Sequence, residues 1–283
     1  MEPLVVTTAE GEIHGRRFDG DGPPAVLLHG GPGMSASYLD PLAQLLAGVF
    51  SPILYQQRGL LPTTVDEPFT VETNVADAGA VIDAAAGGRA WILGHSWGGH
   101  LALHLLVSSP ERIAGAIIVD PLGAHLEVME EFGKRLEAPL TDEERARFEE
   151  IEAREEAGTS TAEESTESLR IVWPSYFADP PTAPPMPDIE LVVPAFAGTM
   201  ASVNAHAEAE TLVRGLPAVP AEIPVLFVHG AASPMPVRAS TESAKLIPHA
   251  EVEVIEGAGH FIWHERPDEV RDVVRAFVAR SST

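Results

Sequence analysis

Six short apolar segments recur along the chain with helix-compatible segments between most of them, and this alternation strongly limits the possible folds. Each segment is rich in Val, Ile or Leu and ends where a glycine or a polar residue appears. Continuous apolar runs of this kind are typical of a parallel sheet that helices cover on both faces. We therefore expect an α/β fold with core strands at PAVLLHG, SPILYQQRG, AWILGHS, AGAIIVD, PVLFVHG and EVEVIEGAG.

The start of the chain predicts two further strands, and the spaces between strands predict helices. EPLVVTTAEG and EIHGRRF have the pattern of an antiparallel pair that leads into the sheet, which brings the total to eight strands. Helices are expected over Glu72–Ala86, Trp97–Ser108 and Asp268–Arg280. The second should stop before Pro110, and the third repeats its apolar residues on one face.

About 100 residues separate AGAIIVD from PVLFVHG, far more than a one-helix crossover needs. We expect a core domain formed by residues 1–122 and 216–283, and a helical cap subdomain formed by residues 123–215. The first half of the cap is charged and helical, with Thr141 and Glu144 as a capping box. The second half, WPSYFADPPTAPPMPDIELVVP, is proline-rich and should be irregular but ordered.

Composition excludes several classes of function. A net charge of −24 argues against nucleic acid or an anionic membrane surface as a partner. The chain has neither an apolar run of about 18 residues for a membrane span nor a secretory signal at its start. It has no cysteine, which excludes thiolate catalysis and zinc–cysteine sites and suits the cytoplasm. We expect a cytoplasmic monomer or homodimer with a small-molecule substrate and no metal or cofactor.

The pentapeptide Gly94-His95-Ser96-Trp97-Gly98 has the G-x-S-x-G pattern of a nucleophilic serine. It follows an apolar strand and opens a helix, which is the setting that a nucleophile elbow requires. Its glycines allow a strained turn that exposes the serine hydroxyl at the end of the strand. A serine needs a base to become a good nucleophile, and acyl transfer also needs donors for the developing oxyanion.

His29-Gly30-Gly31-Pro32-Gly33 follows another core strand and could supply those donors. Its glycines let backbone N–H groups approach a ligand oxygen closely, whereas Pro32 has no N–H to donate. We assign the oxyanion hole to the N–H groups of Gly31 and of Trp97, the residue after the serine.

Four motifs in order carry a resemblance to a known family: HGGPG, QQRG, GHSWGG and GAGHFIWHERP. Over nearly the whole chain they resemble the α/β-hydrolase superfamily, and the first three look most like its proline iminopeptidase branch. That branch usually has Asp where this chain has Gln56. The resemblance implies an α/β-hydrolase fold: a mostly parallel eight-stranded sheet, helices on both faces and a helical cap insert.

His260 is the predicted general base among eleven histidines. It ends the last strand, at the same sheet edge as Ser96, and the resemblance implies that the C-terminal histidine of this loop is the base. His264 should be a loop or packing histidine. His100 and His104 have the i, i+4 spacing of a metal pair but lie on the helix after the elbow without an acidic motif, which favours packing.

The acid of a catalytic triad is where the chain departs from the superfamily pattern. The usual position is the loop after PVLFVHG, where Ser233 stands in place of the usual aspartate. We favour Asp120 at the end of AGAIIVD, which keeps the chain order Ser, Asp, His. The zearalenone lactonases look similar in this displacement. Two alternatives remain open: Glu256 or Glu265 beside His260 orients it, or the acid is absent.

The expected function is serine-dependent hydrolysis of an ester or lactone. The cap should cover a mostly apolar pocket, and its apolar side chains could either line the pocket or form the cap's own core. An aminopeptidase for N-terminal proline is the alternative enzyme, and it would need carboxylates to hold an ammonium group. Glu163, Glu164 and Glu167 are available, although a solvated face suits them better. A non-catalytic binding protein is the third possibility. The candidate pocket residues are Trp173, Tyr176, Phe177, Met186, Phe196 and Met200.

Overall fold

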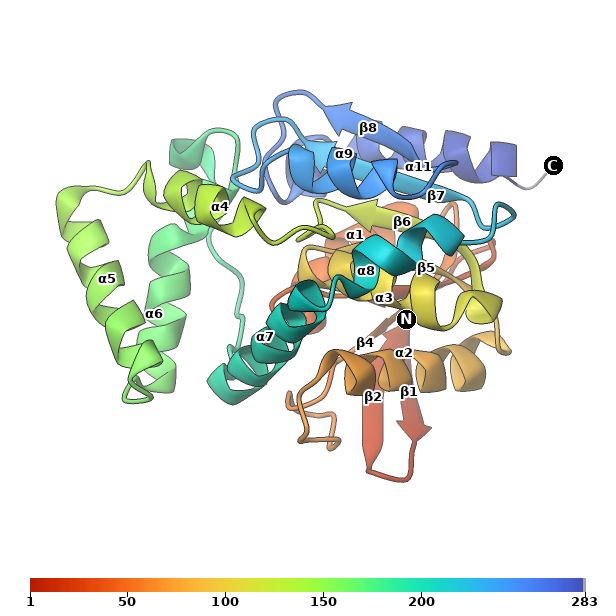
Figure 1. The fold of residues 1–283 in the computed structure, drawn as a ribbon, viewed down its shortest axis with the longest axis horizontal. Helices are drawn as coiled ribbons and strands as arrows, with labels where there is room; N and C mark the ends of the chain where they lie inside the picture. Colours follow the sequence, from red (N-terminus) through yellow and green to blue (C-terminus); the bar gives the residue numbers. More distant parts are fainter. Residues whose placement is uncertain (282–283) are drawn as a thin grey trace.

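The computed structural model describes residues 1–281 and places an eight-stranded sheet at the centre of the molecule (Figure 1). The strand order is β1-β2-β4-β3-β5-β6-β7-β8. Strands β3 to β8 are parallel, whereas β2 is antiparallel to both β1 and β4, which confirms the predicted mostly parallel sheet. The strands are β1 Glu2–Thr7, β2 Glu12–Arg17, β3 Pro24–Leu28, β4 Ser51–Tyr55, β5 Ala90–His95, β6 Ile113–Val119, β7 Val225–Gly230 and β8 Glu251–Ile255.

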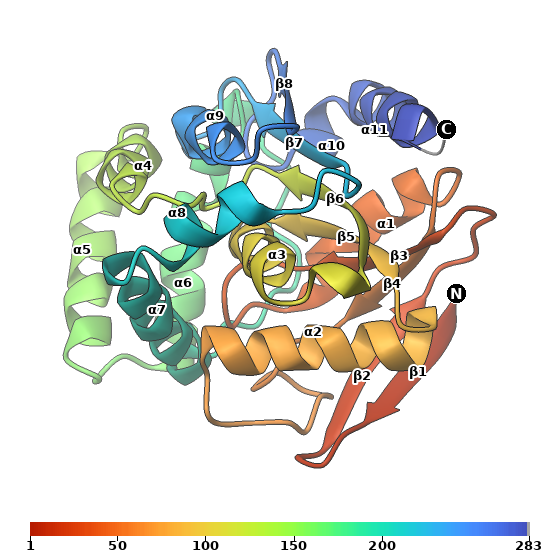
Figure 2. The same ribbon diagram turned by 45° about the vertical axis from the view of Figure 1, so that its right-hand side comes forward.

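Helices cover both faces of this sheet (Figure 2). Side chains alternate across a strand, so neighbouring residues of β5 belong to different apolar cores. Ile92 lies in the core with α2, α3 and α9, whereas Leu93 lies in the core with α1 and α11. The helices of this part are α1 Asp40–Leu46, α2 Val71–Ala86, α3 Trp97–Ser108, α9 Arg238–Lys245, α10 Ile262–Glu265 and α11 Pro267–Ser281, with short 3₁₀ helices η1 Ala36–Leu39 and η2 Pro110–Arg112.

The predicted helices agree with the observed ones to within one residue at each end. Helix α2 begins at Val71 because the Thr70 hydroxyl accepts a hydrogen bond from the Thr73 N–H and so caps the helix. Helix α11 begins at Pro267, since proline suits the first helical position, where no N–H is needed.

In the insert, residues 123–215, helices α4 to α7 form a layer beyond the carboxyl ends of the strands, whereas α8 packs against α3 (Figure 1). The capping box of Thr141 and Glu144 is present at the start of α5. Helix α7 was not predicted; its buried residues Ala195, Thr199 and Val203 include only one large apolar side chain, so its apolar period is weak. The elements of the insert are α4 Val128–Glu137, α5 Asp142–Glu156, α6 Ala162–Val172, η3 Trp173–Tyr176, η4 Pro180–Thr182, α7 Val193–Glu208 and α8 Thr211–Gly215, and η5 Leu216–Ala218 follows it.

The insert is joined to the loop after β3 by backbone hydrogen bonds. Met34 and Leu191 form an isolated antiparallel bridge, and the Val192 N–H donates to the Gly33 carbonyl at 2.8 Å. These contacts hold the insert over the carboxyl edge of the sheet, where parallel sheets bind their ligands. Along residues 1–281, no helix combines the length and apolar character that crossing a bilayer requires.

Candidate active site

Ser96 occupies a sharp turn between β5 and α3, as the G-x-S-x-G pattern predicts. Its backbone has φ 57° and ψ −119°, a conformation that is strained for any residue with a side chain. The neighbouring Gly98 is required by packing, because a Cβ atom there would overlap the carbonyl group of Leu28 in β3. This strand–turn–helix geometry presents the half-exposed Ser96 at the edge of the sheet.

The loop after β3 lies beside Ser96, and Gly30 and Gly31 line the same pocket as the serine. The Gly30 N–H is already used, since it donates to the Tyr38 hydroxyl. Trp97 is the first residue of α3, and the first N–H groups of a helix have no acceptor within it. The positive end of the helix also favours a negative oxygen at this place. Gly31 and Trp97 therefore remain the candidate oxyanion donors.

Two buried side chains, Tyr38 and His95, link this loop to the histidine loop. The Tyr38 hydroxyl is 2.9 Å from Nδ1 of His95, and Nε2 of His95 is 3.1 Å from the carbonyl oxygen of His260. A carbonyl can only accept, so Nε2 carries the proton and Nδ1 accepts from Tyr38. Burial holds the pKa of His95 well below its usual value, consistent with a neutral ring. No motif in the sequence predicts a role in the site for either side chain.

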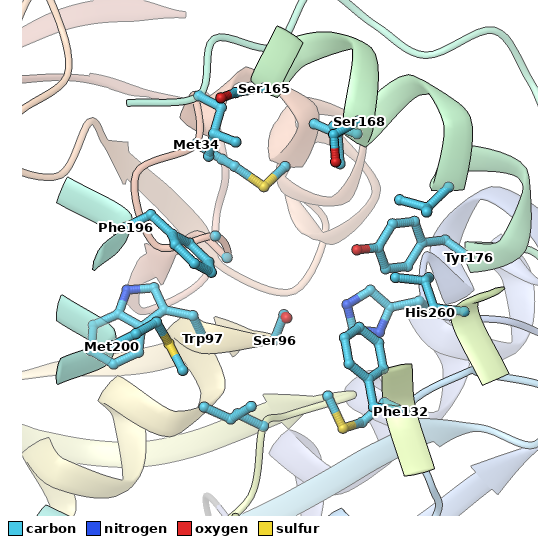
Figure 3. A pocket seen from close by; sticks show the side chains of 18 of the residues that line it. Met34, Ser96, Trp97, Phe132, Ser165, Ser168, Tyr176, Phe196, Met200 and His260 are labelled. Carbon is cyan, nitrogen blue, oxygen red and sulfur yellow. The ribbon is translucent and has the colours of Figure 1, made fainter. Parts of the chain in front are cut away.

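Asp120 and His260 lie in contact at the carboxyl edge of the sheet. Oδ1 of Asp120 is 2.7 Å from Nδ1 of His260, and both side chains are buried. Asp120 follows β6 and has φ 43°, whereas His260 lies in the loop between β8 and α10. The backbone N–H of His260 donates to the carbonyl of Tyr176, which ties the histidine loop to the insert. This contact occupies Nδ1 of His260, and His260 and Ser96 line the same pocket (Figure 3).

Ser233 occupies the position where the superfamily usually has its acid, and it serves the Asp120 carboxylate. Its hydroxyl donates to Oδ1 of Asp120 at 2.7 Å, while the Gly230 N–H donates to Oδ2 at 2.9 Å. Together with His260, these contacts satisfy the buried carboxylate. Asp120 thus reaches from the end of β6 to the loop after β7, the neighbouring strand in the sheet.

The two glutamates near the histidine loop have other contacts. The Glu265 carboxylate accepts from the backbone N–H groups of Ala178 at 2.9 Å and Gly259 at 2.6 Å, so it fixes the loop's backbone. The Glu256 side chain is exposed, and its carbonyl accepts from Arg266. Of the candidate carboxylates, Asp120 is the one whose side chain contacts the His260 ring.

A pocket with a volume of about 480 Å³ lies between the sheet edge and the insert. Ser96, Trp97 and His260 line it together with apolar side chains from α4 to α7 (Figure 3). Of the predicted lining residues, Tyr176, Phe196 and Met200 do line it. Lining residues that the sequence analysis missed include Met34, Met129, Phe132, Leu136, Phe148 and Leu169.

The other three predicted lining residues, Trp173, Phe177 and Met186, do not line the pocket, which corrects that expectation. Trp173 and Phe177 are buried in the core that contains Phe261, and Met186 packs against the same core. Trp173 and Tyr176 are the first and last residues of the 3₁₀ turn and Phe177 follows it, and of the three rings only that of Tyr176 lines the pocket.

The remaining candidates have structural contacts. His100 and His104 are buried, with Nδ1 of His100 at 2.7 Å from the Gly123 carbonyl and the two Nε2 atoms 3.2 Å apart. Within residues 1–281, no group of three or more His, Asp or Glu side chains is arranged to hold a metal ion. Glu164 and Glu167 pair with Arg154 and Arg147 on the insert's surface. Glu163 is exposed.

Comparisons with known proteins agree with this architecture. A proline iminopeptidase from Lactobacillus helveticus is 38% identical over 110 residues, covering 36% of this chain and 37% of the relative. The chain spans about two-fifths of the length of the first curated relatives it matches. Among solved structures, a Mycobacterium smegmatis proline iminopeptidase has a TM-score of 0.70 at 24% identity, covering 99% of this chain and 98% of the other. An enol-lactonase from Burkholderia xenovorans LB400 has a TM-score of 0.67 at 18% identity, covering 98% and 100%.

The family itself follows from a match over most of the sequence. Residues 25–273 match the model of the alpha/beta hydrolase family, a span that includes the elbow, the loop after β3, Asp120 and His260. The solved structures, at identities below 25%, support the same fold. This chain therefore belongs to the alpha/beta hydrolase family.

Proposed function

We propose that this chain is a serine hydrolase that cleaves a carboxylic ester or lactone through an acyl-enzyme on Ser96. The observation that carries the proposal is the 2.7 Å contact between His260 and Asp120, beside the pocket that Ser96 and His260 line together. A carboxylate at Nδ1 keeps the imidazole in the tautomer that presents Nε2 as a base. The order Ser96, Asp120, His260 is also the order of this family's triads.

In the proposed reaction, the Ser96 hydroxyl attacks the substrate carbonyl carbon and His260 takes its proton. The tetrahedral oxyanion accepts hydrogen bonds from the N–H groups of Gly31 and Trp97. When the carbon–oxygen bond breaks, His260 returns the proton to the leaving alkoxide, and water then hydrolyses the acyl-enzyme by the same steps. Asp120 stabilises the imidazolium that forms twice in this cycle.

The pocket supports an ester or lactone substrate. Its wall next to Ser96 is apolar, with Leu122, Phe196 and Met200 among its residues. Such walls suit an apolar acyl or alkyl group. The enol-lactonase from Burkholderia xenovorans LB400 has the same overall fold, which is compatible with this chemistry.

A second candidate is cleavage of N-terminal proline, supported by the Lactobacillus helveticus relative that carries that name. An aminopeptidase must hold an ammonium group directly beside the reacting carbonyl. The carboxylates that line the pocket, Glu152 and Glu155, belong to α5 in the outer part of the insert (Figure 1). This placement favours the ester or lactone over the prolyl substrate.

The test is a matched set of substrates: an aryl ester, a lactone and a prolyl arylamide, each assayed with wild type and with Ser96→Ala. The proposal expects the ester or the lactone to be hydrolysed, with activity lost in Ser96→Ala. Hydrolysis of the prolyl arylamide alone would support the peptidase. If no substrate turns over and Ser96 resists acylating probes, the chain is a binding protein on a hydrolase fold.

A further inference from the structure

In the part of the chain that the structure describes, two polar atoms of the pocket wall have no hydrogen-bonding partner. The Ser165 side chain is fully buried, and its Oγ has no hydrogen-bonding partner among residues 1–281. Oε1 of Glu155 is likewise buried without a partner, and both residues line the pocket. A buried hydroxyl or carboxylate oxygen without a hydrogen bond costs free energy. A polar ligand in the pocket can satisfy both of these atoms.

These groups lie on the facing sides of two packed helices. On α5, Phe148, Glu152 and Glu155 follow one another at i, i+4 and i+7 and all line the pocket. One face of α6 also lines the pocket, and it consists of Ser165, Ser168, Leu169 and Val172. The two lining faces are polar toward the α5–α6 turn and apolar away from it.

The polar end is far from the reacting serine. The α6 helix rises by about 1.5 Å per residue, so Ser165 lies roughly 10 Å from Val172. One turn beyond Val172, the Tyr176 ring lies 5.3 Å from the ring of His260. Figure 3 shows Ser165, Ser168, Tyr176 and His260 in this order along the wall. A group bound at Ser165 therefore lies about two turns of α6 from Val172, on the side away from His260.

The two arginines of α5 that are nearest in sequence to Glu155 pair with other carboxylates. Arg154 is 3.0 Å from Glu164, and Arg147 is 2.7 Å from Glu167. A substrate cation can therefore be the charge that compensates Glu155. A carboxylate and a hydroxyl together suit a primary ammonium, which has three donors and no acceptor.

We propose that the Glu155–Ser165 end of the pocket binds an ammonium group at the far end of the substrate's acyl chain. This inference rests on the proposed function and names the substrate class: esters or lactones of long ω-amino acids. It differs from recognition of an N-terminal α-amino group, which lies only two bonds from the scissile carbonyl carbon and cannot reach Ser165.

The test compares two para-nitrophenyl esters, the octanoate and the ω-aminooctanoate, by the ratio of their kcat/KM values. Wild type should prefer the amino ester, and Glu155→Gln should lower the ratio about tenfold or more, because a charged hydrogen bond is lost. Ser165→Ala should lower the ratio about threefold to tenfold. The matched control is Glu149→Gln, which removes the same charge from an exposed position on α5 and should leave the ratio unchanged.

A binding measurement separates this inference from the proposed function. Ser96→Ala is titrated by calorimetry with N-methyl-ω-aminooctanamide and with N-methyloctanamide, neither of which needs to be hydrolysed. Tighter binding of the amino compound, lost on adding Glu155→Gln or Ser165→Ala, supports the ammonium site even if neither ester turns over. Equal binding of the two amides, or an ester ratio that Glu155→Gln and Ser165→Ala leave unchanged, overturns it.

Discussion

The Ser233 hydroxyl donates a hydrogen bond to Oδ1 of Asp120, the same carboxylate oxygen that contacts Nδ1 of His260. The loop after β7, which usually supplies the acid in this superfamily, here supplies a donor to an acid from the neighbouring strand. The carboxylate position beside His260 is thus kept, and the residue that provides it has moved from β7 to β6. Because Ser233 and Asp120 are in contact, this shift can be tested by moving the carboxylate from position 120 to position 233.

The exchange variant is Asp120→Asn combined with Ser233→Asp. We expect Asp120→Asn alone to lose about 10⁴ in kcat, because His260 loses the partner that fixes its tautomer. The double variant should recover at least part of this loss, about tenfold or more, since the new carboxylate starts from the residue that now contacts Asp120. Rates of ester hydrolysis measure both.

Ser233→Asp alone is the control for that exchange. It places two carboxylates within hydrogen-bonding distance, and one of them then retains a proton. This single variant should be less active than wild type at neutral pH. A double variant no more active than Asp120→Asn would contradict the exchange.

Tyr38→Phe tests the hydrogen-bond chain that joins the loop after β3 to His95. The variant leaves the Gly30 N–H without its acceptor and Nδ1 of His95 without its donor, both in a buried place. We expect the free energy of unfolding to fall by about 1–3 kcal/mol, measured by urea denaturation. Tyr55→Phe is the matched control: its hydroxyl is buried without a partner among residues 1–281, so its removal should be neutral or stabilising. Equal losses in both variants would contradict this role.

The buried His29 predicts a pH-dependent stability. Nε2 of His29 accepts from the Gln57 N–H and Nδ1 donates to the Gly30 carbonyl, which fixes a neutral ring. Burial lowers the pKa of His29 to about 4 from its usual 6.5. Between pH 6.5 and pH 4, His29 is protonated in the unfolded chain but neutral in the folded one. The contribution of His29 to the free energy of unfolding is therefore full above pH 6.5 and falls by about 1.4 kcal/mol for each pH unit below it.

Urea denaturation at pH 7 and pH 5 checks this sign. Wild type should lose about 2 kcal/mol more than His29→Gln over this interval, because only wild type carries the titrating ring. His29→Gln should be less stable than wild type at pH 7, because a glutamine side chain cannot reproduce the geometry of both hydrogen bonds of the His29 ring. The same loss in both proteins would show that His29 does not contribute to the pH dependence.

Local sequence patterns were sufficient to predict the sheet and the elbow. The strands are continuous apolar runs, and Gly98 sits where only glycine lets the turn pack against β3. The contact between Asp120 and His260 also agrees with the expectation from the sequence, because each residue follows a strand at the same edge of the sheet. Each of these inferences depends on residues close together in the sequence or on the geometry of parallel strands.

The roles of Tyr38, His95 and the pocket wall could not be predicted in the same way. Tyr38, in η1, and His95, at the end of β5, act through a side-chain contact between residues that are 57 positions apart in the sequence. Within the insert, Tyr176 faces the pocket while Trp173 and Phe177 are buried elsewhere, although all three have the same apolar character. Which aromatic side chain lines the pocket depends on how the insert packs against the core. A short 3₁₀ turn has no long apolar repeat in the sequence from which this could be predicted.

The central claim, that Asp120 and His260 activate Ser96, is tested most directly by the rate of fluorophosphonate labelling. Wild type and Asp120→Asn are compared, with Ser96→Ala as the blank, so the natural substrate is not needed. We predict fast labelling of wild type, no labelling of Ser96→Ala, and a rate lower by about 10⁴ in Asp120→Asn. Asp120→Asn labelling as fast as wild type would contradict the role of Asp120, and a wild type that does not label would contradict activation of Ser96.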